Sequence, residues 1–138
     1  MERSAELEDF VRESYAIMLA GDVQALSGVL SQAEETLMIG TDPDEWWERR
    51  DAFVAAFQGQ TEAMGGGITL TSADPRAYVE GDIGWVADRP SYRLPDGTEL
   101  SARVTGVLRK ENGNWRWLQS HSSIGVTNQA AFGKELPI

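Results

Sequence analysis

The chain has 138 residues, of which 41% are hydrophobic and 25% are charged, and its formal net charge is −10 at pH 7. This length and composition predict a single globular domain over residues 1–138 and argue against a disordered protein. The twelve lysines and arginines are scattered along the sequence. Without a basic stripe to replace phosphate counterions, we expect no nucleic-acid partner.

The apolar runs and the cysteine content exclude further classes of protein. No apolar run is longer than a few residues, so we predict no membrane span. The first residues are largely polar and lack the apolar core of an export signal, which favours a cytoplasmic protein. The absence of cysteine excludes disulfides, a thiol nucleophile and a thiolate metal site.

The start of the chain predicts two helices followed by a short strand. Apolar residues recur at helical spacing over residues 6–20, and Gly21 is suited to end that helix with a positive φ. Asp22 then suits the cap of a short second helix. Residues 36–39 have the composition of a short buried strand.

A third helix is predicted to begin in the acidic segment after that strand. Asp42 suits its cap, Pro43 its first position, and Glu45 can complete a capping box. The three glycines at residues 65–67 end the helix and precede a β-like run. A flexible connection is therefore favoured over a phosphate-binding loop, which would lead into a helix N-terminus.

The second half of the chain has a β pattern, interrupted by turn signals that each contain a glycine. Short connections of this kind predict an antiparallel meander. The predicted strands cover residues 76–79, 83–94, 100–110 and 115–124.

The predicted turns decide which side chains share a face of the sheet. If the loops at residues 95–97 and 111–113 are three-residue turns, residues of equal parity lie on one face. A two-residue turn at residues 112–113 would instead move His121 to the face of its serine neighbours. With three-residue turns, a mainly aliphatic face suited to pack beneath the helices carries Val86, Asp88, Tyr92, Leu94, Leu100, Ala102, Val104, Leu108, Leu118, Ser120 and Ser122. The opposite face, suited to a second sheet or a partner subunit, carries Trp85, Arg89, Arg103, Thr105, Val107, Trp115, Trp117, Gln119 and His121.

Several motifs, taken in order, resemble the SnoaL-like branch of the nuclear transport factor two-like superfamily. They are the Ala-Gly-Asp at residues 20–22, the segment at residues 39–45, and the segments at residues 103–105, 113–117 and 121–123. The resemblance implies an α+β, cystatin-like fold in which a cone-shaped, curved antiparallel sheet wraps round the N-terminal helices. It also implies an apolar pocket at the open end and a homodimer formed through the outer face of the sheet.

Members of this superfamily include steroid isomerases, polyketide cyclases, epoxide hydrolases and dehydratases, and others bind proteins or only oligomerise. Their catalytic positions match poorly here. The general-base aspartate of the isomerases falls near Ile39 or Gly40, and the last-strand aspartate of the cyclases and hydrolases falls at Ser120. The pocket arginines of the calmodulin-dependent kinase association domain fall at Gly106 and Ser122. None of these constellations transfers intact, and the fold does not choose a function.

Asp88 and His121 are the candidates for acid–base chemistry. Asp88 is either a base with a pKa raised by burial near the serines of the last strand, or a structural carboxylate bonded to backbone groups or hydroxyls. His121 is the only histidine and would pair across the strands with Arg103 in a catalytic interpretation. A structural imidazole at a dimer interface is the favoured alternative. One histidine without clustered carboxylates predicts no metal site, and no cofactor is expected.

Two functions remain open on these residues: a proton-transfer enzyme (isomerase, cyclase or hydrolase) for a hydrophobic substrate, or a non-catalytic ligand-binding or dimerisation module. The expected partners are a small hydrophobic molecule and a second copy of the chain. The predicted pocket residues are Tyr15, Trp47, Phe57, Tyr92, Val104, Ser120 and Ser122. The predicted dimer face consists of Trp85, Arg103, Thr105, Trp117 and Gln119.

Overall fold

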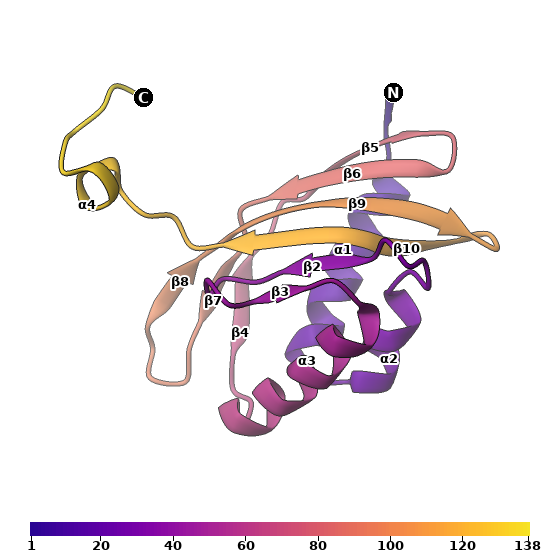
Figure 1. Ribbon diagram of the computed structural model, residues 1–138, viewed down its shortest axis with the longest axis horizontal. Helices are drawn as coiled ribbons and strands as arrows, with labels where there is room; N and C mark the ends of the chain where they lie inside the picture. The colour runs from indigo at the N-terminus through magenta and orange to yellow at the C-terminus, as the bar shows by residue number, and fades with distance from the viewer.

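In the computed structural model, which describes residues 1–138, three helices lie on one side of a large curved sheet (Figure 1). These helices are α1 (Ala5–Leu19), α2 (Val23–Val29) and α3 (Arg50–Met64). A short fourth helix, α4 (Asn128–Phe132), lies in the C-terminal segment, which extends away from the rest of the domain. No helix has both the length and the apolar character needed to cross a bilayer.

The strands form two sheets. The larger has seven strands in the order β1-β5-β6-β9-β10-β2-β3, and the smaller has three in the order β4-β7-β8. The strands of the larger sheet are β1 (Glu2–Arg3), β2 (Leu37–Ile39), β3 (Trp46–Trp47), β5 (Arg76–Glu80), β6 (Ile83–Asp88), β9 (Arg103–Glu111) and β10 (Asn114–Ser123). Those of the smaller sheet are β4 (Thr69–Ser72), β7 (Ser91–Arg93) and β8 (Glu99–Ser101).

The expected α+β class with a curved sheet round the helices is confirmed, and the meander β5-β6-β9-β10 is antiparallel as predicted. The sheet as a whole is mixed, because β2 pairs with β10 in the parallel direction. The predicted long strands at residues 83–94 and 100–110 are each broken in two. Pro90 has no N–H to donate to a sheet ladder, and there the chain leaves the larger sheet for the smaller one.

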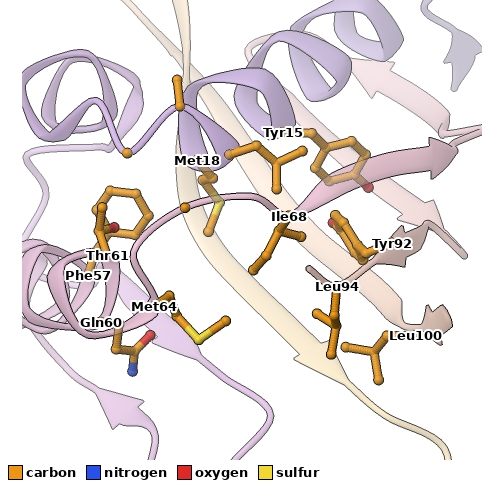
Figure 2. Close-up of a pocket in the computed structure, with 14 residues that line it drawn as sticks. Tyr15, Met18, Phe57, Gln60, Thr61, Met64, Ile68, Tyr92, Leu94 and Leu100 are labelled. Atoms are coloured by element: carbon orange, nitrogen blue, oxygen red, sulfur yellow. The ribbon is translucent and has the colours of Figure 1, made fainter. Parts of the chain in front are cut away.

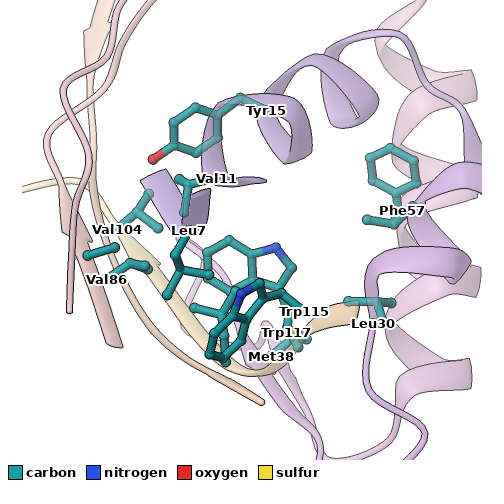
Figure 3. Packing of buried hydrophobic residues seen from close by; sticks show 13 residues of the cluster. Leu7, Val11, Tyr15, Leu30, Met38, Phe57, Val86, Val104, Trp115 and Trp117 are labelled. Atoms are coloured by element: carbon teal, nitrogen blue, oxygen red, sulfur yellow. The ribbon is translucent and has the colours of Figure 1, made fainter. Parts of the chain in front are cut away.

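The first two helices form as their sequence predicts. The Ser4 hydroxyl caps α1 by accepting from the backbone N–H of Leu7 at 3.1 Å, and Asp22 caps α2 by accepting from that of Ala25 at 3.0 Å. Residues four apart on α1 form its buried face. Figure 3 shows Leu7 and Val11 directed toward Val86 and Val104 of the sheet.

The predicted start of the third helix at Asp42 is wrong. Residues 42–45 close a hairpin between β2 and β3, in which Met38 faces Trp47 and Ile39 faces Trp46. The Glu45 carboxylate does reach back to the backbone N–H of Asp42, at 2.8 Å, as it would in a capping box. Here that bond tightens a loop between paired strands, and α3 begins only at Arg50.

The β9–β10 hairpin differs from the predicted one, and this changes which residues of β10 face the core. Its turn has two residues, Asn112 and Gly113, both with positive φ, so that Glu111 pairs with Asn114 rather than Lys110 with Asn114. The register then shifts at Leu118, between Trp117 and Gln119. The two-residue turn places the residues of β10 before Leu118 on the face opposite to the predicted one. The extra residue at Leu118 returns the residues after it to their predicted face.

Trp115 and Trp117 lie in the part of β10 that is reversed. Both were expected on the outer face, yet both are only 6% exposed and belong to the core cluster (Figure 3). The indole Nε1 of Trp117 donates to the Ser14 hydroxyl on α1 at 2.9 Å. Its ring also lies against Gly106 on β9, where a Cβ atom would overlap the ring and lie 2.8 Å from the carbonyl oxygen of Gln119.

We predict that Gly106→Ala lowers the free energy of unfolding by about 1–3 kcal/mol, because the added methyl overpacks the site against Trp117. Gly59→Ala on α3 is the matched control, since a Cβ atom at Gly59 would have no neighbouring atom within 4 Å. It should raise stability by about 0.5–1 kcal/mol, as expected for glycine in a helix interior. Urea denaturation measures both. A Gly106→Ala variant as stable as the wild type would contradict the inward placement of Trp117.

Candidate ligand-binding site

Two adjoining cavities lie between the helices and the two sheets. The first has a volume of about 320 Å³ and the second about 230 Å³. We call them the first and second lobes, because five residues line both. These shared residues are Tyr15, Met18, Phe57, Gln60 and Tyr92.

The first lobe is lined mainly by apolar side chains. Figure 2 shows Met18 of α1, Phe57 and Met64 of α3, and Leu94 and Leu100 around it. Unbranched methionine side chains adapt to ligands of different shape. A concave, mostly apolar site of this size with few polar groups is the usual form of a small-molecule site.

The second lobe brings together all seven side chains predicted to form the pocket. Trp47 contributes from β3, Val104 from β9, and Ser120 and Ser122 from β10. Tyr15, Phe57 and Tyr92 complete the set from the walls shared by both lobes. The serines face inward because the register shift at Leu118 restores their predicted face. A ligand in this lobe stays a prediction.

Asp88 lies behind the cavity rather than in its wall. It ends β6, is 8% exposed and is absent from the lining of both lobes. One carboxylate oxygen accepts from the hydroxyl of Tyr15 at 2.8 Å. The other accepts from the backbone N–H groups of Asp74 at 3.0 Å and Arg89 at 2.7 Å. These bonds favour the structural interpretation of Asp88 over that of a base facing a substrate.

Two tyrosines beside this carboxylate remain neutral at physiological pH. Burial, together with the hydrogen bond to Asp88, raises the pKa of Tyr15 well above its ordinary value. Burial and the nearby negative charge of Asp88 raise the pKa of Tyr92 to about 12. Both phenols at the junction of the lobes are therefore uncharged.

His121 does not reach the cavity. It is exposed on the outer face of β10 and pairs with Thr105, whereas Arg103 pairs with Ser123. The predicted pairing of His121 with Arg103 is wrong because the two-residue turn and the shift at Leu118 offset the strands. The two catalytic candidates, Asp88 and His121, thus lie apart, one behind the cavity and one outside it. No group of three or more potential metal-ligating side chains is present.

The outer face of the sheet carries an aromatic pair. Trp85 on β6 is 40% exposed and stacks on Tyr78 of β5, with ring centroids 4.9 Å apart. Arg103 and Thr105 are exposed on the neighbouring strand β9, and Gln119 is partly buried on β10. Trp117, which we expected on this face, lies in the core instead. Dimerisation through this face stays a prediction.

Sequence reasoning missed several lining residues on α3. Gln60 and Thr61 follow Phe57 by three and four positions and Met64 follows by seven, so all four share one face of the helix. The apolar stripe alone predicts Phe57 and Met64, while the polar residues between them have no such signal. Helical spacing from Phe57 could have identified Gln60 and Thr61. Glu45 was interpreted only as a cap, although it also lines the second lobe.

The raised pKa of Tyr92 predicts a loss of stability in alkali. Folding favours its neutral form, so the stabilisation is complete below the ordinary pKa of 10.0 and is lost as pH rises toward the folded pKa of about 12. The wild type should lose free energy of unfolding steadily from about pH 10 to about pH 12. Tyr92→Phe should lose it less steeply, as measured by urea denaturation at intervals of pH. Parallel curves for the two proteins would contradict a partly buried phenol with a raised pKa at this position.

The chain matches the family model of the SnoaL-like domain over residues 7–127. A search of curated proteins found no significant match. Among solved structures, an NTF2-like protein of unknown function from Pseudomonas putida KT2440 is 15% identical, with a TM-score of 0.71 over 97% of this chain and 96% of that one. An NTF2-like protein with a cystatin-like fold from Novosphingobium aromaticivorans is 21% identical, with a TM-score of 0.69 over 91% of this chain and 84% of that one. A protein of unknown function with a cystatin-like fold from Nostoc punctiforme PCC 73102 is 17% identical, with a TM-score of 0.70 over 91% of this chain and 96% of that one. The chain therefore belongs to the SnoaL-like domain family and has the NTF2-like, cystatin-like fold.

Proposed function

We propose that this protein binds a small hydrophobic molecule in the two-lobed cavity. The observation that carries the proposal is the pair of adjoining lobes, about 320 and 230 Å³, with mostly apolar walls. Protein interiors are otherwise close-packed, and empty spaces larger than a water molecule are few. An apolar ligand that fills the lobes gains dispersion contacts and is removed from water, and both effects favour binding.

The positions of the acid–base candidates support binding rather than proton transfer. A general base must come within hydrogen-bonding distance of the proton it removes. The oxygens of Asp88 are engaged by Tyr15 and by two backbone N–H groups, and His121 lies on the outer face. Neither of these two candidates is therefore placed to take a proton from a ligand in the cavity. Ligand binding requires only the cavity itself.

The proposal predicts that 4-phenylbutan-1-ol, a neutral probe, binds with a Kd on the order of 10 µM to 1 mM. Binding should change the tryptophan fluorescence, because Trp47 and Trp117 line the second lobe. Ser122→Phe should weaken it at least about tenfold, since the new ring occupies space that the ligand needs. Isothermal titration calorimetry gives the two dissociation constants.

Ser123→Phe is the matched control. Ser123 follows Ser122 on the same strand, points to the opposite face and lines neither lobe. It should bind the alcohol like the wild type. A wild type that binds no hydrophobic probe at millimolar concentration, or equal weakening by the two variants, would count decisively against the cavity.

We also propose that the chain forms a homodimer through the outer face of the sheet. The support is the outward-facing stack of Trp85 on Tyr78, together with Thr105 and Arg103, which are exposed two and four residues along β9 from the partner of Trp85, Val107. Exposed aromatic residues with arginine nearby are typical of interface centres. Sedimentation equilibrium at micromolar concentration should give a dimer for the wild type and a monomer for Trp85→Asp. A monomeric wild type would refute this proposal and leave the binding proposal intact.

A further inference from the structure

The polar groups that line the two lobes include no cation. Neither lobe has a lysine, arginine or histidine in its wall. Recognition of a carboxylate or phosphate would ordinarily use such a group, and burial of an anion without one is costly. The composition of the walls therefore disfavours anionic ligands.

One carboxylate, that of Glu45, does line the second lobe. The backbone N–H of Asp42 donates to its Oε1 at 2.8 Å, and the Nε2 of Gln60 donates to its Oε2 at 2.7 Å. These bonds fix the carboxylate in place without neutralising it. Glu45 takes part in none of the four salt bridges of the protein, so its negative charge has no cationic partner.

Two polar side chains at the junction of the lobes, Tyr15 and Gln60, also present acceptors, while the hydroxyl of Tyr92 there can donate or accept. The hydroxyl proton of Tyr15 is directed to Asp88, which leaves the lone pairs of the phenol oxygen available. The amide nitrogen of Gln60 is directed to Glu45, which leaves its carbonyl oxygen as an acceptor. Both side chains line both lobes. A ligand that satisfies these two acceptor oxygens brings hydrogen-bond donors.

Aromatic rings line the same lobe as Glu45. Trp47 and Phe53 pack together with ring centroids 5.3 Å apart, and Phe57 lines the cavity beside them. The faces of such rings attract cations through their quadrupoles, most strongly where water is excluded. A lobe whose wall contains both a carboxylate and aromatic rings thus suits one kind of ligand head group, a protonated amine.

We propose that the cavity selects an apolar molecule that carries a protonated amine, with the ammonium group beside Glu45 and the hydrophobic part in the lobes. This inference rests on the proposed binding function and specifies its ligand class. The formal net charge of −10 acts in the same direction at longer range, because it attracts cations and repels anions.

The test compares three head groups on one hydrophobic part: 4-phenylbutan-1-amine, 4-phenylbutan-1-ol and 4-phenylbutanoate. Isothermal titration calorimetry at pH 7 and physiological ionic strength should show the amine binding about tenfold tighter than the alcohol. 4-Phenylbutanoate should bind about tenfold more weakly than the alcohol, because Glu45 repels its negative charge and no cationic side chain lines the lobes.

Two variants separate a local effect of Glu45 from the overall charge of the protein. In Glu45→Gln the ratio of amine to alcohol affinity should fall from about ten to about one, since the ammonium group loses its charged partner. Glu62→Gln removes the same charge from an exposed position on α3 that lines neither lobe. In that control the ratio should stay near ten.

The outcomes distinguish this inference from the function on which it rests. If the alcohol binds but the carboxylate binds as tightly as the amine, the ligand class is wrong and the binding function stands. The same holds if Glu45→Gln and Glu62→Gln change the ratio equally. If none of the three compounds binds the wild type, both proposals fail. If Glu45→Gln does not fold, the ranking of head groups on the wild type still tests the ligand class: a carboxylate that binds as tightly as the amine contradicts it.

Discussion

The hydrogen bonds to the buried carboxylate of Asp88 are the interaction on which the rest of the structure depends. A carboxylate removed from water is costly unless donors surround it, and here the Tyr15 hydroxyl and two backbone N–H groups do so. They join helix α1 to the end of β6, where the chain leaves the larger sheet. Pro90 follows, and β7 then pairs within the smaller sheet. The cavity occupies the space between the sheets and the helices that this change of direction leaves open.

The same bonds determine what the cavity offers a ligand. Because Tyr15 covers Asp88, the junction of the lobes presents a neutral phenol rather than an ionised base. The only acidic group in the wall is Glu45, held by the β2–β3 loop and by Gln60 of α3. Asp88 is thus bonded within the fold behind the wall, and Glu45 is the carboxylate placed to meet the ligand that we propose.

Local sequence signals predicted the elements that depend on local interactions. Asp22 caps α2 as expected, since a cap bond involves residues three apart. The acidic pattern at residues 42–45 led to the wrong start for α3, because the hydrogen bond between Asp42 and Glu45 has the same form in a hairpin loop and in a helix cap. Only the pairing of β2 with β3, which is a tertiary contact, distinguishes the hairpin loop from the helix cap.

The inward orientation of Ser120 and Ser122 was predicted correctly although the predicted turn was wrong. The two-residue turn and the register shift at Leu118 have opposite effects on which face a residue occupies, so they cancel at the serines. Trp117 lies between the turn and the register shift, so it faces the core instead of the predicted outer face. No local sequence pattern marks Leu118 as the extra residue of the strand.

The most direct test of this account is a double-mutant cycle between Tyr15→Phe and Asp88→Asn, with the free energy of unfolding measured in urea. A buried hydrogen bond to a carboxylate predicts a coupling energy of about 1–3 kcal/mol between the two positions. Effects of the two substitutions that add to within about 0.3–0.5 kcal/mol would show that the side chains do not interact. Such additivity would contradict the link between α1 and the end of β6 on which the cavity depends.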